Sequence, residues 1–307
     1  MKYGGGVLKQ LEIFLKKYTY FPGETIEGVV ILRLSQPLKV RKLTLRFTGI
    51  EKVKIDSEGS VGDKYDWGSY TSTFPIITKT EHLTPKMQIP EGEHHRKFSF
   101  TLPNDALPSY RGVHANVTYL LKTHADVPFW FDVKTQRTIW VMYHPSNIQL
   151  LSKSISSSTE DFYPLNSKPK RRKGLFGEKE PKPSFKVDLD KNTFLAGETI
   201  TGMILIRNPT EKTIRKVKIK LWAQEYASAQ GETKYTTRRV FKHAIEMDEL
   251  VLDTPTNFAI PIPRNVATSY TGRFSNCVWY LDFQLDIAFT RDVKKSIPIA
   301  IYQWKNR

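Results

Sequence analysis

Positive charge is concentrated in one short run of this 307-residue sequence. The run has five basic residues within six positions, namely Lys168, Lys170, Arg171, Arg172 and Lys173. Leu175 and Phe176 follow it after one glycine. Each positive charge near an anionic membrane contributes roughly 1 kcal/mol, and a neighbouring apolar pair can enter the lipid. The sequence therefore indicates a membrane- or phosphate-binding element at these seven residues.

Two other interpretations of the basic run stay open. A solvated spacer between two domains has a similar composition, because such charge runs are common in linkers. Nucleic acid also attracts clustered lysine and arginine, and nucleic-acid binding is the least favoured of the three interpretations. The net charge of +16 draws anions of every kind and does not choose among them. For most of the 47 basic residues a purely solubilising role is an equal alternative.

Catalytic and metal-binding chemistry is not indicated elsewhere. The sole cysteine, Cys277, lies in an expected core strand and lacks the electropositive, exposed setting that activates a thiol. Of the seven histidines, His94 and His95 are adjacent, on opposite faces of an expected strand, and the others are isolated. A Gly-x-Ser-x-Gly nucleophile motif is absent. We therefore expect no enzyme activity, no metal site and no cofactor.

Composition also predicts the compartment. A single cysteine excludes an intrachain disulfide, and the first thirty residues lack the apolar run of a signal peptide. No stretch approaches the roughly 18 apolar residues of a membrane-spanning helix. We expect a cytoplasmic protein whose membrane contact, at endosomal or plasma membrane, is peripheral.

A long internal repeat defines the elements that position these residues. Residues 20–30 recur as residues 194–204, displaced by 174 positions. Residues 108–112 recur as 268–272, displaced by 160. Repeats of solenoid proteins are only about 20–50 residues long, so this repeat indicates two similar domains.

Alternating apolar and polar residues predict the fold class. Residues 43–48, 98–102 and 216–221 alternate cleanly, which is typical of strands with one solvated face. Helical periodicity of similar length is hard to find. The sequence therefore predicts an all-β chain of two tandem antiparallel β-sandwiches of immunoglobulin-like type.

Domain boundaries follow from the repeat and the composition. We expect an N-terminal sandwich at 1–143, a basic flexible linker at 144–183 and a C-terminal sandwich at 184–307. The turn at Pro22 and Gly23 predicts a hairpin. The difference between the two displacements places extra length in the first half, and we expect it at 55–72 as a long exposed loop.

The order of these motifs resembles the arrestin superfamily, including the α-arrestins and the retromer subunit of arrestin fold. The most specific stretches are residues 107–122, with a Ser-Tyr-Arg-Gly turn before an aromatic-rich strand, and residues 128–134. The resemblance covers nearly the whole chain except the linker. It implies an arrestin-like pair of β-sandwiches.

The resemblance implies an adaptor or scaffold that binds protein partners, such as membrane cargo, receptor tails or sorting and coat subunits in endosomal trafficking. It also implies that Lys16 and Lys17 sense phosphate on a partner, with a solvated strand face as the equal alternative. A second function is similar to that of the sporulation-control arrestin-fold proteins. Such a structural or stress-related interaction protein acts without membrane sorting.

Several arrestin features are missing from the sequence. Residues 138–141, Thr-Ile-Trp-Val, stand where receptor-binding arrestins have the polar-core arginine. The sequence ends at Arg307 without an autoinhibitory tail, and it has no Pro-Pro-x-Tyr motif. We therefore do not expect a phosphate-triggered release switch.

Overall fold

The computed structural model describes residues 8–61, 64–128, 133–164, 167, 172–174, 177–179, 181–246, 248 and 250–304. The chain forms two compact units. The first unit comprises residues 1–143 together with 227–234 and 270–275, and the second comprises the remaining residues. Both units are built from β-sheets, which confirms the predicted all-β fold class of tandem sandwiches.

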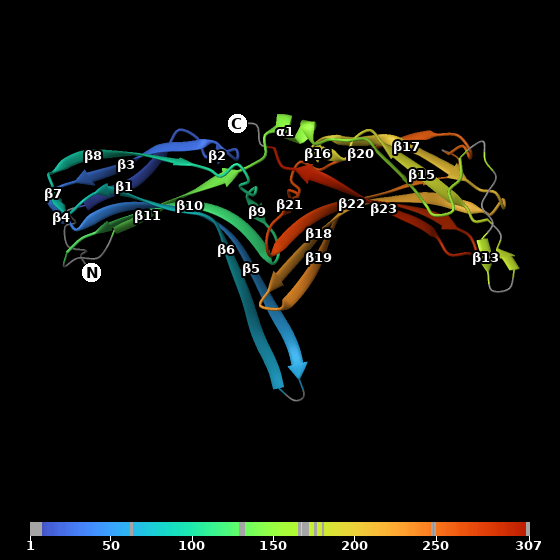
Figure 1. The fold of residues 1–307 in the computed structure, drawn as a ribbon, viewed down its shortest axis with the longest axis horizontal. Helices are drawn as coiled ribbons and strands as arrows, with labels where there is room; N and C mark the ends of the chain where they lie inside the picture. Colours follow the sequence, from blue (N-terminus) through green and yellow to red (C-terminus); the bar gives the residue numbers. More distant parts are fainter. Residues whose placement is uncertain are drawn as a thin grey trace. The chain divides into compact units, whose positions relative to one another are not determined.

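The first unit is a sandwich of two sheets. A three-stranded sheet of order β1-β3-β8 lies above a sheet of order β2-β11-β10-β5-β6, with β9 paired to β10 (Figure 1). Strands β4 and β7 form a separate pair. The strands are β1 Leu8–Leu15, β2 Thr19–Tyr20, β3 Thr25–Leu34, β4 Leu38–Val40, β5 Lys42–Val61, β6 Lys64–Thr84, β7 Met87–Ile89, β8 Gly92–Thr101, β9 Tyr110–Arg111, β10 Ala115–Asp126 and β11 Val133–Val141.

The second sandwich repeats this plan, and its strands include the segments 227–234 and 270–275 that are grouped with the first unit. One sheet has the order β12-β15-β17-β20, the other has the order β16-β23-β22-β18-β19 with β21 on β22, and β13 pairs with β14. Its elements are α1 Pro145–Leu150, β12 Ile155–Ser158, β13 Arg172–Gly174, β14 Gly177–Lys179, β15 Ser184–Leu189, β16 Thr193–Leu195, β17 Thr199–Arg207, β18 Ile214–Ala229, β19 Glu232–Glu246, β20 Thr256–Pro261, β21 Tyr270–Thr271, β22 Ser275–Ile287 and β23 Val293–Tyr302.

Aromatic side chains join the two sheets of each sandwich. In the first unit the ring centroids of Phe47 on β5 and Phe100 on β8 are 5.6 Å apart. In the second unit the ring centroid of Phe283 on β22 lies 6.4 Å from that of Phe185 on β15 and 5.2 Å from that of Phe258 on β20. Burial of such rings is a large favourable term in sandwich stability.

The repeated Ser-Tyr-x-Gly motif has a structural cause. The Ser109 hydroxyl accepts a hydrogen bond from the Val141 backbone N–H at 2.9 Å. The Ser269 hydroxyl accepts one from the Ile301 N–H, also at 2.9 Å. Each serine therefore ties its loop to the last strand of its sandwich, and the motif recurs because this tie recurs.

The turn at Gly23 joins two sheets, so the predicted hairpin is wrong. Gly23 has the expected positive φ of 81°, and Gly197 has 93° at the repeated position. Strand β2, before the turn, pairs with β11 in parallel. Strand β3, after it, pairs with β1 and β8 in the other sheet. Alternation predicted the strands but could not identify their partners.

The extra length of the first half lies where the sequence predicts it, but it is not a loop. Strands β5 and β6 continue as one hairpin, paired from Ile55 with Tyr70 to Val61 with Lys64 (Figure 1). These strands have 20 and 21 residues, whereas β18 and β19 have 16 and 15. The segment is rich in glycine and serine, but its backbone groups satisfy one another across the hairpin.

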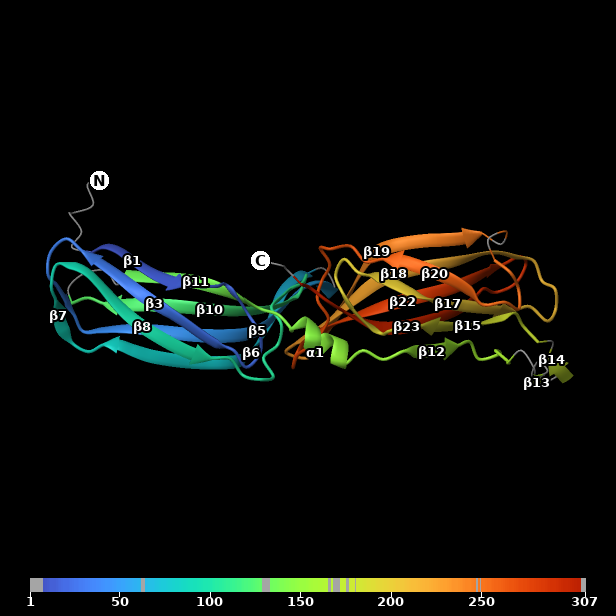
Figure 2. The same cartoon turned by 90° about the horizontal axis from the view of Figure 1, so that it is seen from above.

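Part of the segment predicted to be a flexible linker is folded. Helix α1 buries Ile148, and strand β12 pairs with β15 at the edge of the second unit (Figure 2). Tyr163 is 7 % exposed, and the Arg207 guanidinium lies 4.6 Å from its ring centroid. Scattered apolar residues thus anchor a polar segment, and such anchoring leaves no signal in its average composition.

Candidate interaction surfaces

The basic run lies mostly beyond what the structure describes. Lys168, Lys170, Arg171, Leu175 and Phe176 fall outside the described residues. Arg172 and Lys173 belong to strand β13, where they pair with Lys179 and Glu178 of β14. The predicted lipid contact therefore stays a prediction.

The structure gives Lys16 and Lys17 different surroundings. The Lys17 ammonium lies 2.7 Å from a Glu24 carboxylate oxygen and 4.8 Å from the centroid of the Tyr20 ring. Lys16 is exposed just after β1 and lines a hollow in the surface. Lys16 forms no ion pair with any residue that the structure describes, so of the two lysines it is the one available to a ligand.

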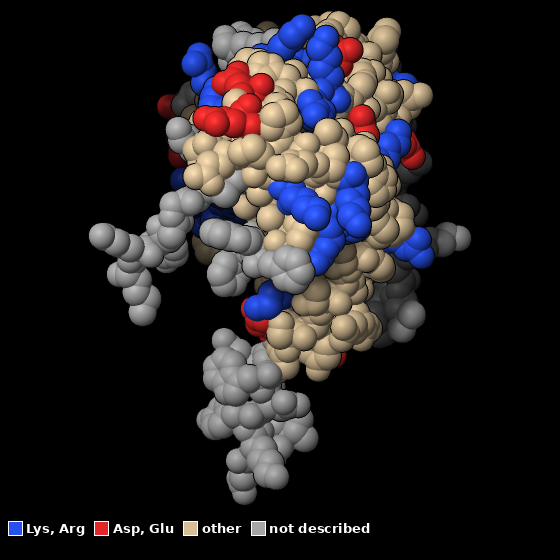
Figure 3. Space-filling model, turned by 90° about the vertical axis from the view of Figure 1, so that its left-hand side faces the viewer, with Lys and Arg blue, Asp and Glu red and all other residues tan. Residues whose placement is uncertain are grey.

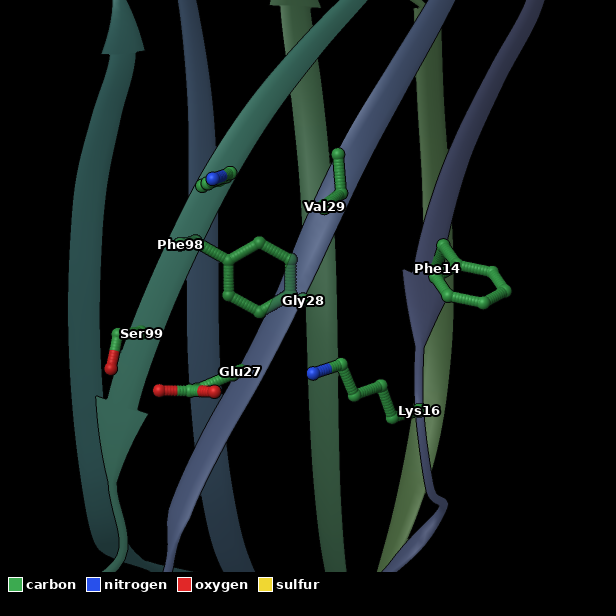
Figure 4. Close-up of a pocket in the computed structure, with 8 residues that line it drawn as sticks. Phe14, Lys16, Glu27, Gly28, Val29, Phe98 and Ser99 are labelled. Carbon is green, nitrogen blue, oxygen red and sulfur yellow. The ribbon is translucent and has the colours of Figure 1, made fainter.

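The hollow beside Lys16 lies on the sheet of β1, β3 and β8. We call it the Phe14 hollow and define it by Phe14, Lys16, Glu27, Val29, Lys97 and Phe98. Its volume is about 450 Å³. Figure 4 shows Lys16, which follows the end of β1, reaching toward Glu27 on β3, and the Phe98 ring at Gly28. The hollow thus combines apolar walls with two positive charges and one negative charge.

A second hollow lies on the β18, β22 and β23 face of the second unit. We call it the basic hollow and define it by Lys218, Lys220, Trp222, Asp282, Lys294 and Lys295. Its volume is about 270 Å³. Among the described residues no ion pair engages Lys220, Lys294 or Lys295. Trp222 stacks on Tyr280 at 4.7 Å between ring centroids and forms a flat apolar wall.

The one paired lysine of the basic hollow faces Asp286. The Lys218 ammonium lies 2.5 Å from one Asp286 oxygen, and Arg215 binds the other. The hydrogen bonds from Lys218 and Arg215 hold the pKa of the Asp286 carboxyl below its usual range. Asp286 is only 5 % exposed, and both of its oxygens are engaged by Lys218 and Arg215. It therefore does not neutralise the other lysines of the basic hollow, which stay available to an anionic ligand.

The sequence signal for the basic hollow was present but incomplete. Alternation in 216–221 correctly predicts that lysines share the outward face of β18, because the intervening residues are buried. Alternation does not reveal that Lys294 of β23 lines the same hollow as these lysines. That proximity depends on the pairing of β22 with β23.

Basic side chains also predominate on the end of the first unit that carries β4 and β7. Figure 3 looks onto this end and shows more lysine and arginine than aspartate and glutamate. Attraction of anions is therefore not confined to the two hollows. The hollows differ from the rest of the basic surface because they are concave and can enclose part of a ligand.

One buried carboxylate of the first unit was missed by the sequence analysis. Glu51 on β5 is 0 % exposed. Its carboxylate accepts hydrogen bonds from the backbone N–H groups of Arg273 at 2.8 Å and Phe274 at 2.9 Å, and from the Ser275 hydroxyl at 2.7 Å. The only sequence signal is strand parity, because Glu51 shares the inward face of β5 with Val53. These three hydrogen bonds hold residues 273–275 in place, so the arrangement indicates a role in stability rather than in catalysis.

Cys277 is buried as predicted, at 2 % exposure. Over the described ranges, no group of histidine, cysteine and acidic residues could hold a metal ion. No helix in the part of the chain that the structure describes is long and apolar enough to cross a membrane.

Comparison with known proteins identifies the family. Residues 10–145 match the model of the arrestin (or S-antigen) N-terminal domain, and residues 179–306 match that of the arrestin C-terminal domain. Arrestin domain-containing protein 1 of Rattus norvegicus is 25 % identical over 162 residues, covering 50 % of this chain and 35 % of that protein. Arrestin domain-containing protein B of Dictyostelium discoideum is 22 % identical over 224 residues, covering 73 % of this chain and 34 % of that protein.

The chain thus spans about a third of the length of these relatives. Both family models are matched in order and each falls on one of the two sandwiches. Together the two matches cover most of the sequence, as the repeat and the strand pattern predict. The chain belongs to the arrestin family.

Proposed function

We propose that this chain is a non-enzymatic adaptor that docks peripherally on anionic membrane and binds protein partners on its sandwich faces. The partners are membrane cargo, receptor tails or sorting and coat subunits, and the proposed location is the cytoplasmic side of endosomal or plasma membrane. Family membership supports the adaptor role, because arrestin-domain proteins generally serve as adaptors in protein trafficking.

The basic hollow is the observation that carries the membrane contact. Three of its lysines, Lys220, Lys294 and Lys295, have no ion-pair partner within the described residues. Lys220 on β18 and Lys294 on β23 lie on the same outward face as the Trp222 ring, whereas Lys295, the next residue of β23, belongs to the opposite face. An anionic lipid surface attracts each such charge by roughly 1 kcal/mol, so the two outward charges supply about 2 kcal/mol, or roughly thirtyfold in affinity. The basic run at residues 168–173 adds five charges of the same sign.

Co-sedimentation with liposomes tests the membrane contact. Liposomes of graded phosphatidylserine and phosphoinositide content are mixed with the wild-type chain and with two variants. One variant changes Lys220, Lys294 and Lys295 to serine, and the other changes Lys170, Arg171, Arg172 and Lys173 to serine. We expect binding to require anionic lipid and to fall at least tenfold in each variant.

The matched control removes three exposed charges elsewhere. Lys39, Lys42 and Lys86 of the first unit are exposed and have no ion-pair partner among the described residues. Their triple change to serine lowers the net charge as much as the change in the basic hollow does. Equal losses in both triple variants would reduce the contact to unspecific charge. Binding that needs no anionic lipid would favour the alternative of an interaction protein without membrane sorting.

A further inference from the structure

A further hollow lies in the second unit, on the outward face of the sheet of β12, β15, β17 and β20. We call it the Met203 hollow and define it by Asp190, Thr201, Gly202, Met203, Asn257 and Phe258. Its volume of about 470 Å³ falls in the usual range of ligand pockets, roughly 300–1,000 Å³. The hollow is therefore large enough to hold one or two side chains of a partner.

Strand register builds this hollow. Gly202 on β17 pairs with Phe258 on β20, and the two form its floor because Gly202 has no side chain and Phe258 is buried. Met203, the next residue of β17, pairs with Asp188 on β15 and with Asn257 on β20. The Met203 side chain is 43 % exposed, so it offers apolar area to a ligand. Methionine accommodates varied apolar partners because it is flexible and polarizable.

The Met203 hollow carries a negative charge. Asp190 is its acid, and among the described residues no lysine or arginine lines it. The Thr201 hydroxyl donates a hydrogen bond to the Asp190 carboxylate, and no ion pair engages Asp190 in the part of the chain that the structure describes. Lys186, on the same strand as Asp188, is held by that residue at 3.0 Å. The hollow thus presents an uncompensated carboxylate beside an exposed apolar side chain.

This negative charge stands out on a chain of net charge +16. Two lysines line the Phe14 hollow and four line the basic hollow. The surface as a whole therefore repels cations, and the Met203 hollow is a place where a cation meets a carboxylate instead.

The internal repeat shows that the fold does not dictate this charge. Gly28 pairs with Phe98 in the Phe14 hollow as Gly202 pairs with Phe258 here. Asp190 stands where the Phe14 hollow has Lys16, at a displacement of 174 positions. The duplicated backbone thus provides the same shape with the opposite charge, so the acid belongs to the chemistry of this hollow and not to the architecture.

The spacing of the hollow suits an extended segment. Thr201 and Met203 point to the same side of β17, about 7 Å apart. Asp190 lies beside Thr201, because its backbone N–H donates to the Thr201 carbonyl oxygen. Alternate residues of an extended peptide have the same spacing of about 7 Å. A bulky apolar side chain over Met203 and a basic side chain two positions away, beside Asp190, therefore match the hollow.

Segments of this composition flank the membrane spans of membrane proteins. Short cytoplasmic loops carry an excess of lysine and arginine close to the ends of transmembrane helices. Tryptophan and tyrosine are enriched at the same level, where the helix leaves the membrane. Such a segment supplies the cation and the large apolar side chain together.

We propose that the Met203 hollow binds an extended basic segment of a membrane-protein partner, of the kind that follows a transmembrane helix on the cytoplasmic side. One aromatic side chain of the segment packs on Met203 above Gly202, and a lysine or arginine two positions away pairs with Asp190. Anionic lipid does not fit here, because its phosphate would face Asp190. The inference names a class of partner and rests on the adaptor role of the proposed function.

A peptide titration without lipid tests the inference. The probe is a labelled nine-residue peptide with a central tryptophan, a lysine two positions away on each side and serine elsewhere. One comparison peptide has glutamate in place of both lysines, and another has serine in place of tryptophan. Binding to the full chain is measured by fluorescence anisotropy up to 1 mM protein. Because most of the surface repels cations, saturable binding of the basic peptide reports a local acidic site.

We expect saturable binding of the basic peptide and at least tenfold weaker binding of both comparison peptides. D190S and M203S should each weaken binding about tenfold, whereas K186S should strengthen it about twofold because it releases Asp188. E27S is the matched control, since it removes one exposed acid from the equivalent sheet of the first unit, and it should bind like wild type. All four positions are exposed or half-buried, and a thermal unfolding curve of each variant checks the fold.

Several results would overturn the inference. They are the absence of saturable binding, equal binding of either comparison peptide, and equal losses in D190S and E27S. Self-association that D190S abolishes, seen by analytical ultracentrifugation without peptide binding, would assign the hollow to a second copy of the chain instead.

Liposome co-sedimentation separates this inference from the membrane part of the proposed function. D190S should bind anionic liposomes like wild type, and a loss there would contradict the assignment of the hollow to a protein segment. Failure of the peptide with liposome binding intact would overturn the inference and leave membrane docking standing.

Discussion

The ammonium of Lys17 and the carboxylate of Glu24 form an ion pair of 2.7 Å that closes the turn between two sheets of the first unit. Glu24 also accepts a hydrogen bond from the Phe21 backbone N–H at 2.9 Å. The pair recurs 174 positions later as Lys191 and Glu198, again at 2.7 Å. The Gly-Glu motif of the repeat is therefore a turn clasp, and it uses the charge of Lys17 internally.

Glu24→Gln should destabilise the first unit. Glutamine keeps one acceptor but loses the charge, so the bond to Lys17 weakens, and we expect a loss of about 1–2 kcal/mol in the free energy of unfolding. Glu198→Gln should cost about the same, because its contacts are the same. Urea unfolding of both variants measures the effect. Glu27→Gln is the control, and a loss as large in that exposed position would refute the clasp.

Glu51→Gln should cost more than the loss of either clasp. The carboxylate of Glu51 is fully buried and accepts three hydrogen bonds. An amide group cannot accept all three with the same strength, and its N–H atoms would face backbone donors. We expect a loss of about 2–4 kcal/mol, seen as a lower urea midpoint. Exposed Glu91→Gln is the control, and equal midpoints for the two variants would contradict the role of Glu51.

Local sequence patterns predicted most of the fold because strands leave a local signal. Alternation identified β5, β8 and β18, and the repeat identified the duplication. Pairing is not local, so the sequence could not show that the turn at Gly23 separates two sheets or that residues 55–72 pair as a hairpin. The contact between Tyr163 and Arg207 could not be predicted for the same reason, because the two residues are far apart in the sequence.

The candidate surfaces were less predictable than the fold. Lys16 and Lys17 look alike in sequence, yet only the structure shows that Glu24 engages one of them. The Phe14 hollow needs Lys97, which is 81 positions from Lys16 and reaches it through the pairing of β3 with β8. Charge runs within a segment are visible in a sequence, whereas charges that converge from three strands are not.

Stability of the second unit should depend on pH through Asp286. Hydrogen bonds from Lys218 and Arg215 lower the folded-state pKa of this carboxyl. A depressed carboxyl pKa stabilises the fold at pH values above the ordinary aspartate pKa of about 4, and the contribution is lost as the pH falls through the folded-state value. Asp286→Asn removes this dependence.

The measurement is the thermal midpoint of wild type and Asp286→Asn between pH 7 and pH 2. We expect the wild type to be more stable at neutral pH and the two curves to converge in acid. Asp282→Asn is the matched control on the same strand, because the Asp282 carboxylate accepts a hydrogen bond from the neutral Ser296 hydroxyl. A difference between wild type and Asp286→Asn that stays constant over the whole range would contradict the assignment.

Gly28 is required because of the Phe98 ring, and Gly28→Ala should therefore be destabilising. A Cβ at Gly28 would lie 2.5 Å from Phe98 Cζ and 2.6 Å from the Phe14 carbonyl oxygen. Overpacking of this kind costs about 1–3 kcal/mol. At Gly202 a Cβ would meet Phe258 Cζ at 3.0 Å and the Asp188 carbonyl oxygen, so Gly202→Ala should cost a similar amount.

A double-mutant cycle separates the two clashes at Gly28. If the ring is the main obstacle, Phe98→Leu should make Gly28→Ala less costly than it is in the wild type, by about 1 kcal/mol in urea unfolding. If the Phe14 carbonyl is the main obstacle, the free-energy costs of Gly28→Ala and Phe98→Leu should be additive. Additive costs would contradict the role assigned to the ring, and would mean that close approach of β1 and β3 fixes the glycine.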